Sequence, residues 1–388
     1  MRALVLGAGK SGKAAAALLR EQGAEVVVLA DDARDAIGER SFDFAVVSPG
    51  IALAHPWIAE AKRRGIPLKS ELQLGCEELK RRGWKLMAVT GSKGKSSVVK
   101  VVAEAMGAVP CGNYGLPVCE VSRRGGDWAV VEVSSFMMET TELPADTFEA
   151  AAILNLQEDH LDRHGSAEVY HGLKRKLLTM AKKGFGPAMT GGSRSLWEGS
   201  YFDNEILAEN AAAAVGLMRV TGLEDAAIAK AFRDFTPLPH RMNLVAEIDG
   251  VRYVDDSKST SVAALVAGVR MASASPRSPR LSFPVLLIAG GLPKGDDPKK
   301  ALPALTERVK KVYLIGQSAE TFFAAWKGAV DCEICGTLDR AVEKAKREAV
   351  KGETVLLSPG TASFDQFCSF EERGEVFSAL VKKERKEK

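Results

Sequence analysis

The sequence lacks the features that mark a secreted, membrane-spanning or strongly charged protein. Its 53 basic and 50 acidic residues nearly cancel, which leaves a net charge of +3 over 388 residues. That balance gives no general reason to expect binding to nucleic acid or to a membrane. No hydrophobic run approaches the ~18 residues that cross a bilayer. Glycines and lysines interrupt the apolar N-terminal stretch, so it does not read as a signal peptide.

Cysteine is also scarce, and its spacing excludes the common structural uses of the residue. Of the six cysteines, Cys332 and Cys335 form a single C-x-x-C, and no second pair lies at zinc-site spacing. We therefore expect reduced thiols in a cytoplasmic protein, with no disulfide framework and no metal centre built from cysteine.

What is present is a long globular chain that alternates strands and helices. Its length indicates two or three domains, and its 46% hydrophobic and 27% charged residues are typical of soluble proteins. The alternation predicts an α/β fold with parallel sheets covered by helices. Strands are expected at residues 3–6, 25–30, 44–47, 66–69, 128–133, 150–154, 251–254, 285–289, 311–315 and 354–357. Helices are expected at residues 13–22, 55–64, 170–183, 204–221 and 225–234, and a surface loop at 271–284.

The most informative segment, residues 84–106, reads as a hydrophobic strand, a Gly/Ser/Lys loop and a helix. Gly91 and Gly94 permit a tight turn and close approach of the backbone to a ligand. Lys95 can reach the outer phosphates of a nucleotide, and the Ser96 hydroxyl can bind Mg²⁺. The spacing, G-x-x-G-K-S, is shorter than the Walker pattern. Its position between a strand and a helix favours phosphate binding over an ordinary glycine turn.

Three polar residues follow predicted strands of the same unit as this loop. Glu132 ends one strand and can bind Mg²⁺, and Asn155 and His160 follow the next strand. A histidine at such a position is as often a structural residue as a ligand. Because parallel strands end at one edge of a sheet, we expect Glu132 and His160 to lie near Ser96.

The first βα turn, GAGKSG at residues 7–12, matches G-x-G-x-x-G. With Asp31 after the second strand it suggests an NAD-dependent oxidoreductase, but Lys10 and Ser11 could equally hold a nucleotide diphosphate. The oxidoreductase hypothesis leaves the Lys95 loop unexplained. In the last third of the chain, loops at residues 255–261, 290–297 and 358–374 each follow a strand and suit anionic substrates.

Eight strings in order give the chain a resemblance to a known family. They are SPGIALAHP, TGSKGKSS, GNYGLPV, EVSSFMMETT, ILNLQEDHLDRH, LPHR, DDSKST and LLSPGTASFDQFCSFEERG. Over nearly its whole length the sequence resembles the Mur ligases. The resemblance implies three domains: a Rossmann-like UDP-binding domain at residues 1–72, a central P-loop-type ATPase domain at 73–237 and a C-terminal Rossmann-like domain at 238–388.

The resemblance also implies a reaction and its participants. The chain is most similar to the members that add D-glutamate to UDP-N-acetylmuramoyl-L-alanine, a step of peptidoglycan precursor synthesis. ATP would phosphorylate the L-alanyl carboxylate, and the D-glutamate amine would attack the resulting acyl phosphate. Two Mg²⁺ ions are expected to offset the negative charge. We expect a cytoplasmic monomer that binds neither nucleic acid nor membrane.

The resemblance further implies roles for individual residues. Lys95, His160 and Lys174 would be catalytic. Lys174 would be carbamylated, with Lys176 as the alternative register. ATP would contact Gly91, Ser92, Lys93, Gly94, Lys95, Ser96, Ser97, Asn210, Arg241, Asp256 and Lys258. The metal ions would contact Ser96, Glu132, His160 and Lys174. The UDP-substrate would contact Lys10, Ser11, Asp31, Gly50, Asn113 and Ser134. D-Glutamate would contact Thr260, Lys294, Ser363, Phe364 and Phe370.

The sequence departs from the family pattern at several points. Lys93 stands where the family has Asn or Thr, and the chain between Lys174 and Asn210 is short. Rival interpretations are another amide ligase of the superfamily and an inactive nucleotide-binding protein. The D-N-P-R motif of the diamino-acid ligases is missing, and a folate ligase would not need the N-terminal domain. Intact Lys95 and Glu132, together with the His160 and Lys174 candidates, argue against an inactive protein.

Overall fold

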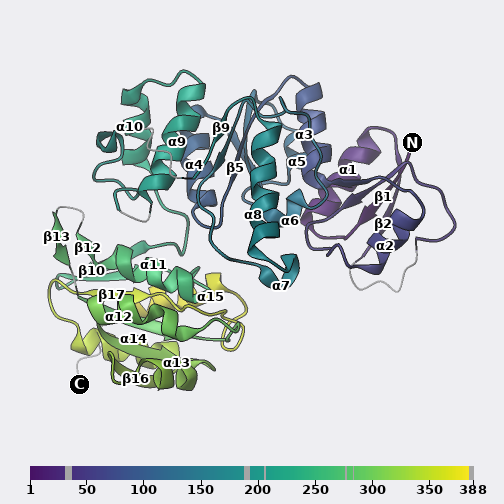
Figure 1. Cartoon of the computed structure of the whole chain (residues 1–388). Coiled ribbons are helices and arrows are strands. Elements are labelled where there is room, and N and C mark those ends of the chain that lie inside the picture. The colour runs from purple at the N-terminus through teal and green to yellow at the C-terminus, as the bar shows by residue number, and fades with distance from the viewer. Residues whose placement is uncertain (31–36, 188–192, 205–206, 276–277, 283, 384–388) are drawn as a thin grey trace. The chain divides into compact units, whose positions relative to one another are not determined.

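A computed structural model describes the chain except for residues 31–36, 188–192, 205–206, 276–277, 283 and 384–388. The described residues form two compact units, Met1–Phe235 and Thr236–Lys388 (Figure 1). The first unit contains two parallel sheets and the second contains one large sheet. The fold is therefore α/β throughout, as the alternating pattern predicts.

The first sheet has four parallel strands in the order β2-β1-β3-β4. Its strands are β1 (Arg2–Leu6), β2 (Glu25–Leu29), β3 (Phe44–Val47) and β4 (Leu68–Ser70). Its helices are α1 (Lys10–Glu21) and α2 (Pro56–Arg63), and α3 (Glu71–Arg81) follows β4 directly. β1 and β3 are hydrophobic runs because helices cover both faces of the sheet. The loops after these two neighbouring strands therefore lie at one edge of the sheet.

The second sheet of this unit has five parallel strands in the order β6-β7-β5-β8-β9. They are β5 (Lys85–Thr90), β6 (Val109–Gly112), β7 (Trp128–Glu132), β8 (Ala150–Ile153) and β9 (Gly184–Phe185). The helices are α4 (Lys95–Met106), α5 (Val118–Val121), α6 (Ser135–Met138), α7 (Leu161–His164), α8 (Ala167–Lys176), α9 (Ala208–Val220) and α10 (Asp225–Asp234).

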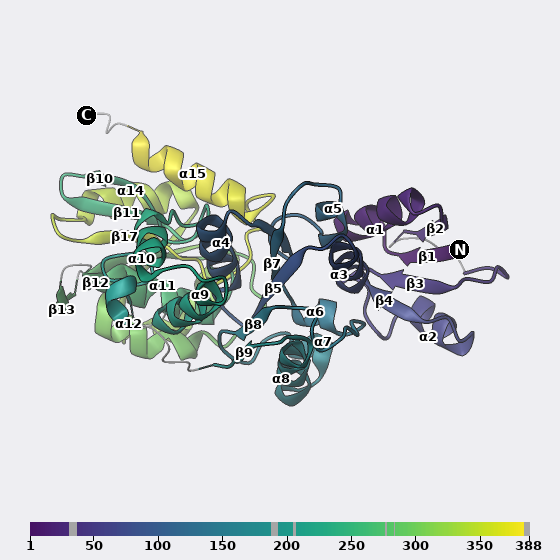
Figure 2. The same cartoon turned by 90° about the horizontal axis from the view of Figure 1, so that it is seen from above.

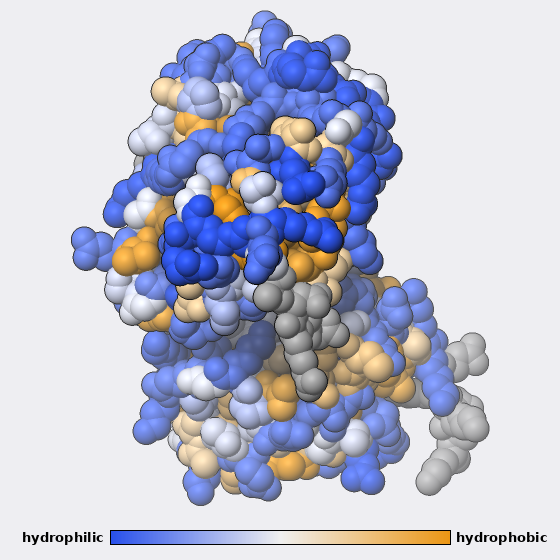
Figure 3. Space-filling model, turned by 90° about the vertical axis from the view of Figure 1, so that its right-hand side faces the viewer, coloured by the Kyte–Doolittle hydropathy of each residue, from blue (hydrophilic) through white to orange (hydrophobic). Residues whose placement is uncertain are grey.

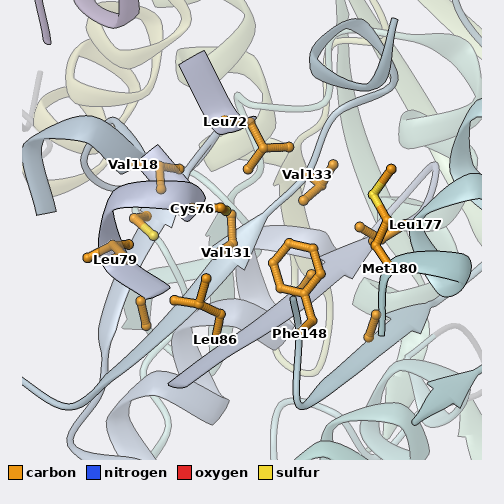
Figure 4. Packing of buried hydrophobic residues seen from close by; sticks show 14 of the residues in the cluster. Leu72, Cys76, Leu79, Leu86, Val118, Val131, Val133, Phe148, Leu177 and Met180 are labelled. Atoms are coloured by element: carbon orange, nitrogen blue, oxygen red, sulfur yellow. The ribbon is translucent and has the colours of Figure 1, made fainter. Parts of the chain in front are cut away.

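Helices cover both faces of this central sheet. On one face, side chains from α3 and α5 pack with Leu86 and Val131 of the sheet and with Phe148 (Figure 4). On the other face, α4 contacts α9 and α10 (Figure 2). Burying these apolar surfaces stabilises the sheet by roughly 25 cal/mol for each Å² removed from water. The loops at the carboxyl ends of β5, β7 and β8 are thereby held on a rigid frame.

The second unit has a six-stranded sheet in the order β10-β11-β17-β14-β15-β16, in which only β10 is antiparallel to its neighbour. Its strands are β10 (Asn243–Ile248), β11 (Val251–Asp255), β14 (Val285–Gly290), β15 (Val309–Ile315), β16 (Asp331–Gly336) and β17 (Thr354–Leu357). Its helices are α11 (Val262–Ser273), α12 (Leu302–Arg308), α13 (Ala319–Trp326), α14 (Leu338–Glu348) and α15 (Phe370–Lys382). Two hydrophobic clusters, one on each face, hold the layers together.

Three local expectations need correction. The segment expected as a loop at 271–284 begins inside α11 and continues as β12 (Ala274–Ser275), which pairs antiparallel with β13 (Ser278–Ser282). Backbone pairing forms there without a hydrophobic pattern that a sequence could reveal. The helix expected over 170–183 ends at Lys176 and continues as a 3₁₀ turn. The helix expected to start at 204 begins at Ala208.

The surface shows no sign of a membrane-spanning element within the described ranges, where every helix is too short or too polar to cross a bilayer. On the face drawn in Figure 3, hydrophilic residues dominate and hydrophobic residues are scattered among them. Single exposed apolar side chains of this kind are normal for globular proteins.

Candidate active site

The loop after β5 has the backbone geometry of a phosphate-binding turn. Gly91 has φ of 152° and Gly94 has φ of 83°, so both occupy a region that favours glycine. Gly94 caps the N-terminus of α4. A Cβ built on Gly94 would lie only 2.0 Å from the Asn210 side-chain nitrogen. The loop therefore needs glycine for both conformation and space, and it leaves the first backbone N–H groups of α4 for an anion.

Two lysine amines converge on one carbonyl oxygen of this loop. Lys95 Nζ donates to the Gly91 carbonyl at 2.8 Å and to the Ser92 carbonyl at 3.1 Å, and Lys174 Nζ donates to the same Gly91 carbonyl at 3.0 Å. Lys174 is only 1% exposed. Burial, followed by the positive charge of Lys95, lowers the pKa of Lys174 to about 7. Near neutral pH a large share of Lys174 is therefore an uncharged, nucleophilic amine. Lys176, the alternative register, instead pairs with Glu142 at the surface.

Asn155, to which the sequence reasoning assigned no role, holds the tip of the loop. Its side-chain oxygen accepts from the Lys93 N–H at 2.8 Å, and its side-chain nitrogen donates to the Lys93 carbonyl at 3.0 Å. Its backbone carbonyl accepts from the Ser92 N–H at 3.0 Å. The same amide nitrogen lies 3.4 Å from the side-chain oxygen of Asn210, which is 1% exposed. The available signal was the position of Asn155 directly after a buried strand that neighbours β5.

The unusual Lys93 has a local partner. Its ammonium lies 3.9 Å from the Asp159 carboxylate, and both side chains are more than one-third exposed. An exposed pair of this kind contributes little to stability, about 0–1 kcal/mol. The lysine charge thus faces a carboxylate at the rim of the loop, whereas its backbone, held by Asn155, shapes the loop.

Glu132 is a buried carboxylate with one oxygen left without a protein partner. The residue is 1% exposed and stands opposite Val89 of β5 in the sheet register. Its Oε1 accepts from the Asn113 side chain at 2.8 Å, whereas Oε2 has no hydrogen-bond partner among the described residues. A buried, unpaired carboxylate oxygen is costly, and it is the type of ligand that Mg²⁺ prefers.

A magnesium ion at this place would need ligands besides protein carboxylates. Within the described part of the chain, no group of three or more His, Cys, Asp or Glu side chains could hold a metal ion. Ser96 lies in the first turn of α4 and is half-buried, and Ser97 behind it is buried. Phosphate oxygens and water would complete the coordination of an ion bound to Glu132 and Ser96, which is the usual arrangement for Mg²⁺.

His160 lies on a strained turn and is the N-cap residue of α7. It is a non-glycine residue with φ of 53°, and its side chain is 47% exposed. Its ring centroid lies 4.9 Å from that of Phe136 and 6.1 Å from that of Tyr170. Tyr170 is buried, and its hydroxyl donates to Ser92 Oγ at 3.2 Å. Tyr170 therefore connects His160 to the loop after β5.

The residues expected to hold the UDP group lie at the edge of the first sheet. Lys10 and Ser11 begin α1, and Gly50 follows the neighbouring β3. Lys10 and Gly50 are exposed and Ser11 is half-buried. Asp31 falls outside the described residues. Ser134 acts as the N-cap of α6 by accepting from the Met137 N–H at 3.3 Å, so its hydroxyl has a structural partner.

In the second unit, the loops after β11, β14 and β17 lie side by side because these strands are neighbours. The loop after β14 carries the exposed Lys294 and pairs with the loop after β17 through Leu292 and Ala362. Ser363 is buried and Phe364 is 68% exposed. Thr260 is half-buried in the loop after β11. The structure thus gathers the residues expected to bind D-glutamate at one edge of this sheet.

Asp256, which follows β11, is a buried carboxylate of the same edge. Ser358 Oγ donates to it at 2.9 Å and the Met242 N–H donates at 3.3 Å. Burial raises the pKa of Asp256 to about 7, although the Ser358 hydrogen bond and the charge of Arg241 act in the opposite direction. Nearby, the Lys258 ammonium lies 3.6 Å from the centroid of the Phe370 ring, in cation–π contact.

Arg373, which the sequence reasoning missed, holds two of these loops together. Its guanidinium is completely buried and donates to Ser257 Oγ at 2.9 Å, and to the carbonyls of Ser257 (2.9 Å), Thr361 (3.2 Å) and Ala362 (3.2 Å). Burial lowers its pKa to about 10. It therefore remains charged near neutral pH and fixes the loops after β11 and β17. The sequence showed only an arginine in the final motif, because its partners are mostly backbone carbonyls.

The central parallel sheet carries a glycine-lysine loop at the start of the helix that follows β5. Two further sheets covered by helices belong to the same chain. This combination is typical of a multidomain α/β protein that binds nucleotides. The chain belongs to the Mur ligase family. Residues 89–186 match the Mur ligase middle domain, and residues 240–360 match the Mur ligase glutamate ligase domain.

Known proteins resemble the chain over nearly its full length. It is 32% identical to the UDP-N-acetylmuramoylalanine–D-glutamate ligase of Chlamydia caviae, over 98% of this chain and 97% of the relative. It is 33% identical to the enzyme of the same name from Myxococcus xanthus, over 98% of both chains. Among solved structures, the fold resembles the UDP-N-acetylmuramate-alanine ligase MurC of Thermotoga maritima, with a TM-score of 0.58 and 15% sequence identity. The match covers 98% of this chain and 99% of the MurC chain.

Proposed function

We propose that this chain is an ATP-dependent ligase that joins D-glutamate to UDP-N-acetylmuramoyl-L-alanine. The observation that carries the proposal is the convergence of Lys95, the buried Lys174 and the half-unpaired Glu132 around one phosphate-binding loop. That arrangement suits the transfer of a phosphoryl group. The choice of substrates is supported by relatives of this name at 32–34% identity.

The reaction has two steps. A carboxylate oxygen of the L-alanyl group attacks the γ-phosphorus of ATP, and the bond to the leaving ADP oxygen breaks. The D-glutamate amine then attacks the carbonyl carbon of the acyl phosphate, inorganic phosphate leaves, and the amine loses a proton. Lys95 and the N-terminus of α4 would stabilise the charge on the transferred phosphoryl group. Mg²⁺ bound by Ser96 and Glu132 would neutralise further phosphate charge.

Lys174 is proposed to act as a carbamate. Its neutral amine would attack carbon dioxide and release one proton, which leaves an anionic carbamate on Nζ. The depressed pKa of Lys174 supports this step, because only the uncharged amine is a nucleophile. The carbamate and His160 would then hold a second Mg²⁺. In this view the hydrogen bond from Lys174 to Gly91 describes the uncarbamylated lysine.

The remaining contacts are proposals that follow the sheet edges described above. Lys10, Ser11, Asp31, Gly50, Asn113 and Ser134 are proposed for the UDP-substrate. Gly91, Ser92, Lys93, Gly94, Ser97, Asn210, Arg241, Asp256 and Lys258 are proposed for ATP. Thr260, Lys294, Ser363, Phe364 and Phe370 are proposed for D-glutamate. Since the reaction consumes ATP and the six cysteines are free thiols, we infer a cytoplasmic location.

The test measures phosphate release from ATP and Mg²⁺ with UDP-N-acetylmuramoyl-L-alanine and each candidate amino acid. Phosphate release should require both the UDP-substrate and D-glutamate. L-Glutamate and L-lysine should not replace D-glutamate, and NAD should not support a reaction. Lys95→Met should abolish turnover, whereas Lys62→Met, at an exposed lysine of α2, should not. Turnover with a different amino acid, or none with D-glutamate, would refute the assignment.

A further inference from the structure

Arg163 joins two regions that are far apart in the sequence. Its guanidinium donates to the Ile51 carbonyl at 2.9 Å and to the Gly50 carbonyl at 3.4 Å, in the turn after β3. It also forms a two-pronged ion pair with Glu139, with Nε to Oε1 at 3.0 Å and Nη2 to Oε2 at 2.6 Å. One side chain of α7 therefore connects the first sheet of the unit to the second.

The surroundings of this guanidinium show a built, desolvated contact. The side chains of Arg163 and Glu139 are 13% and 6% exposed. The guanidinium carbon lies 4.4 Å from the centroid of the Phe136 ring. His164 also contacts this carboxylate, with Nδ1 3.3 Å from Glu139 Oε1 and Nε2 3.0 Å from Ser135 Oγ. A planar guanidinium suits this set of partners, because it can contact a carboxylate, two carbonyls and an aromatic face together.

Arg163 belongs to the short helix α7, of which His160 is the N-cap residue. The backbone N–H groups of Arg163 and His164 both donate to the His160 carbonyl at 3.1 Å. The Phe136 ring that packs under the guanidinium also packs against the His160 ring. A continuous path of contacts thus leads from the Gly50 turn through Arg163 to His160.

We propose that Arg163 is a positioning residue that fixes the turn at residues 50–51 relative to α7. This proposal rests on the proposed function, in which Gly50 lies at the UDP group and His160 helps to hold the second Mg²⁺ where the L-alanyl carboxylate is phosphorylated. The two ends of one substrate molecule are then held at a set separation. Fixing that separation lowers the cost of orienting the substrate, since a small misplacement of reacting groups slows a reaction strongly.

The test compares Arg163→Lys with Arg123→Lys. Arg123 is a suitable control because it also links the two sheets, through Glu21 of α1, but its side chain is 49% exposed. A lysine at 163 keeps the charge and loses the simultaneous bonds to carbonyls and carboxylate. We expect KM for the UDP-substrate to rise about tenfold, which corresponds to the loss of one or two hydrogen bonds. KM for ATP should change less than about twofold, and the control should resemble the parent protein.

Binding of UDP alone, measured by calorimetry, gives a readout independent of turnover and should weaken only in the position-163 variant. Glu139→Gln, which keeps the shape of the clamp, should show a smaller change in the same direction and serves if Arg163→Lys does not fold. Equal KM values in the two arginine variants would overturn the proposal. So would a uniform loss of activity that follows a lower melting temperature. A parent protein without ligase activity would instead refute the proposed function.

Discussion

Replacing Asp256 with asparagine should make the second unit more stable at neutral pH and less active. Asp256 is 8% exposed, and its pKa is raised from 3.8 to about 7, chiefly by burial. Asparagine has nearly the same shape and can keep the contacts with the Ser358 hydroxyl and the Met242 N–H. It removes only the buried charge, so the change isolates the cost of that charge.

The sign and size of the effect follow from proton linkage. The folded protein keeps the Asp256 proton to higher pH than the unfolded chain does. The contribution of this group to stability is therefore full below pH 4 and is lost as pH rises towards 7. A shift of about three pKa units corresponds to ~4 kcal/mol. Asp256→Asn should be more stable than the parent by up to that amount at pH 8, with a difference that vanishes near pH 4.

The assay is urea unfolding at several pH values between 4.5 and 8. A brief hydrogen-exchange pulse at fixed pH would label the unfolded fraction, and mass spectrometry of peptides covering β17 would report on the second unit alone. Asp339→Asn is the control of opposite sign, because a hydrogen bond from Thr337 lowers the pKa of Asp339. A stability difference for Asp256→Asn that does not change with pH would refute the reasoning.

Three further changes test the first unit. Lys174→Ala should abolish turnover, and added short carboxylic acids should restore part of it. In the parent protein, activity should rise with pH through about 7 as the Lys174 amine loses its proton. A pH profile without a step near 7 would contradict the role of the neutral amine. Gly94→Ala should raise KM for ATP at least tenfold, because the added methyl group would collide with Asn210. Gly172→Ala is the control, since a Cβ at Gly172 meets nothing within 4 Å. It should leave the kinetics unchanged and raise the free energy of unfolding by about 0.5–1 kcal/mol. Glu132→Gln should raise the Mg²⁺ concentration needed for half-maximal activity without lowering the melting temperature, because it removes a charge whose second oxygen has no protein partner; an unchanged Mg²⁺ requirement would exclude it as a ligand.

Much of the fold could be predicted because buried parallel strands have continuous runs of apolar residues in the sequence. The strands at residues 44–47 and 354–357 begin and end where expected. The pairing of β12 with β13 could not be predicted, since these short, Ser-containing strands carry no apolar alternation. The helix expected over 170–183 ends earlier, and the sequence hides its end because the following 3₁₀ turn, Leu177–Met180, contains leucine and methionine, which favour helices.

The candidate site also has parts that the sequence predicts and parts that only the folded structure shows. The glycine-lysine loop between β5 and α4 could be predicted, because the conformation of Gly94 and the position of Lys95 depend on a few consecutive residues. Its clamp by Asn155 could not, because that contact joins residues 62 positions apart.

The sequence by itself determined the alternation of strands and helices, the position of the glycine-lysine loop between β5 and α4, and the family to which the chain belongs. Only the tertiary structure decided that Lys174 is buried against Gly91, that one oxygen of Glu132 lacks a protein partner, and that Arg163 and Arg373 hold separate loops together. The physical reason is that local conformation depends on neighbouring residues in the chain. Burial, charge and pairing depend instead on segments that only the folded sheets bring into contact.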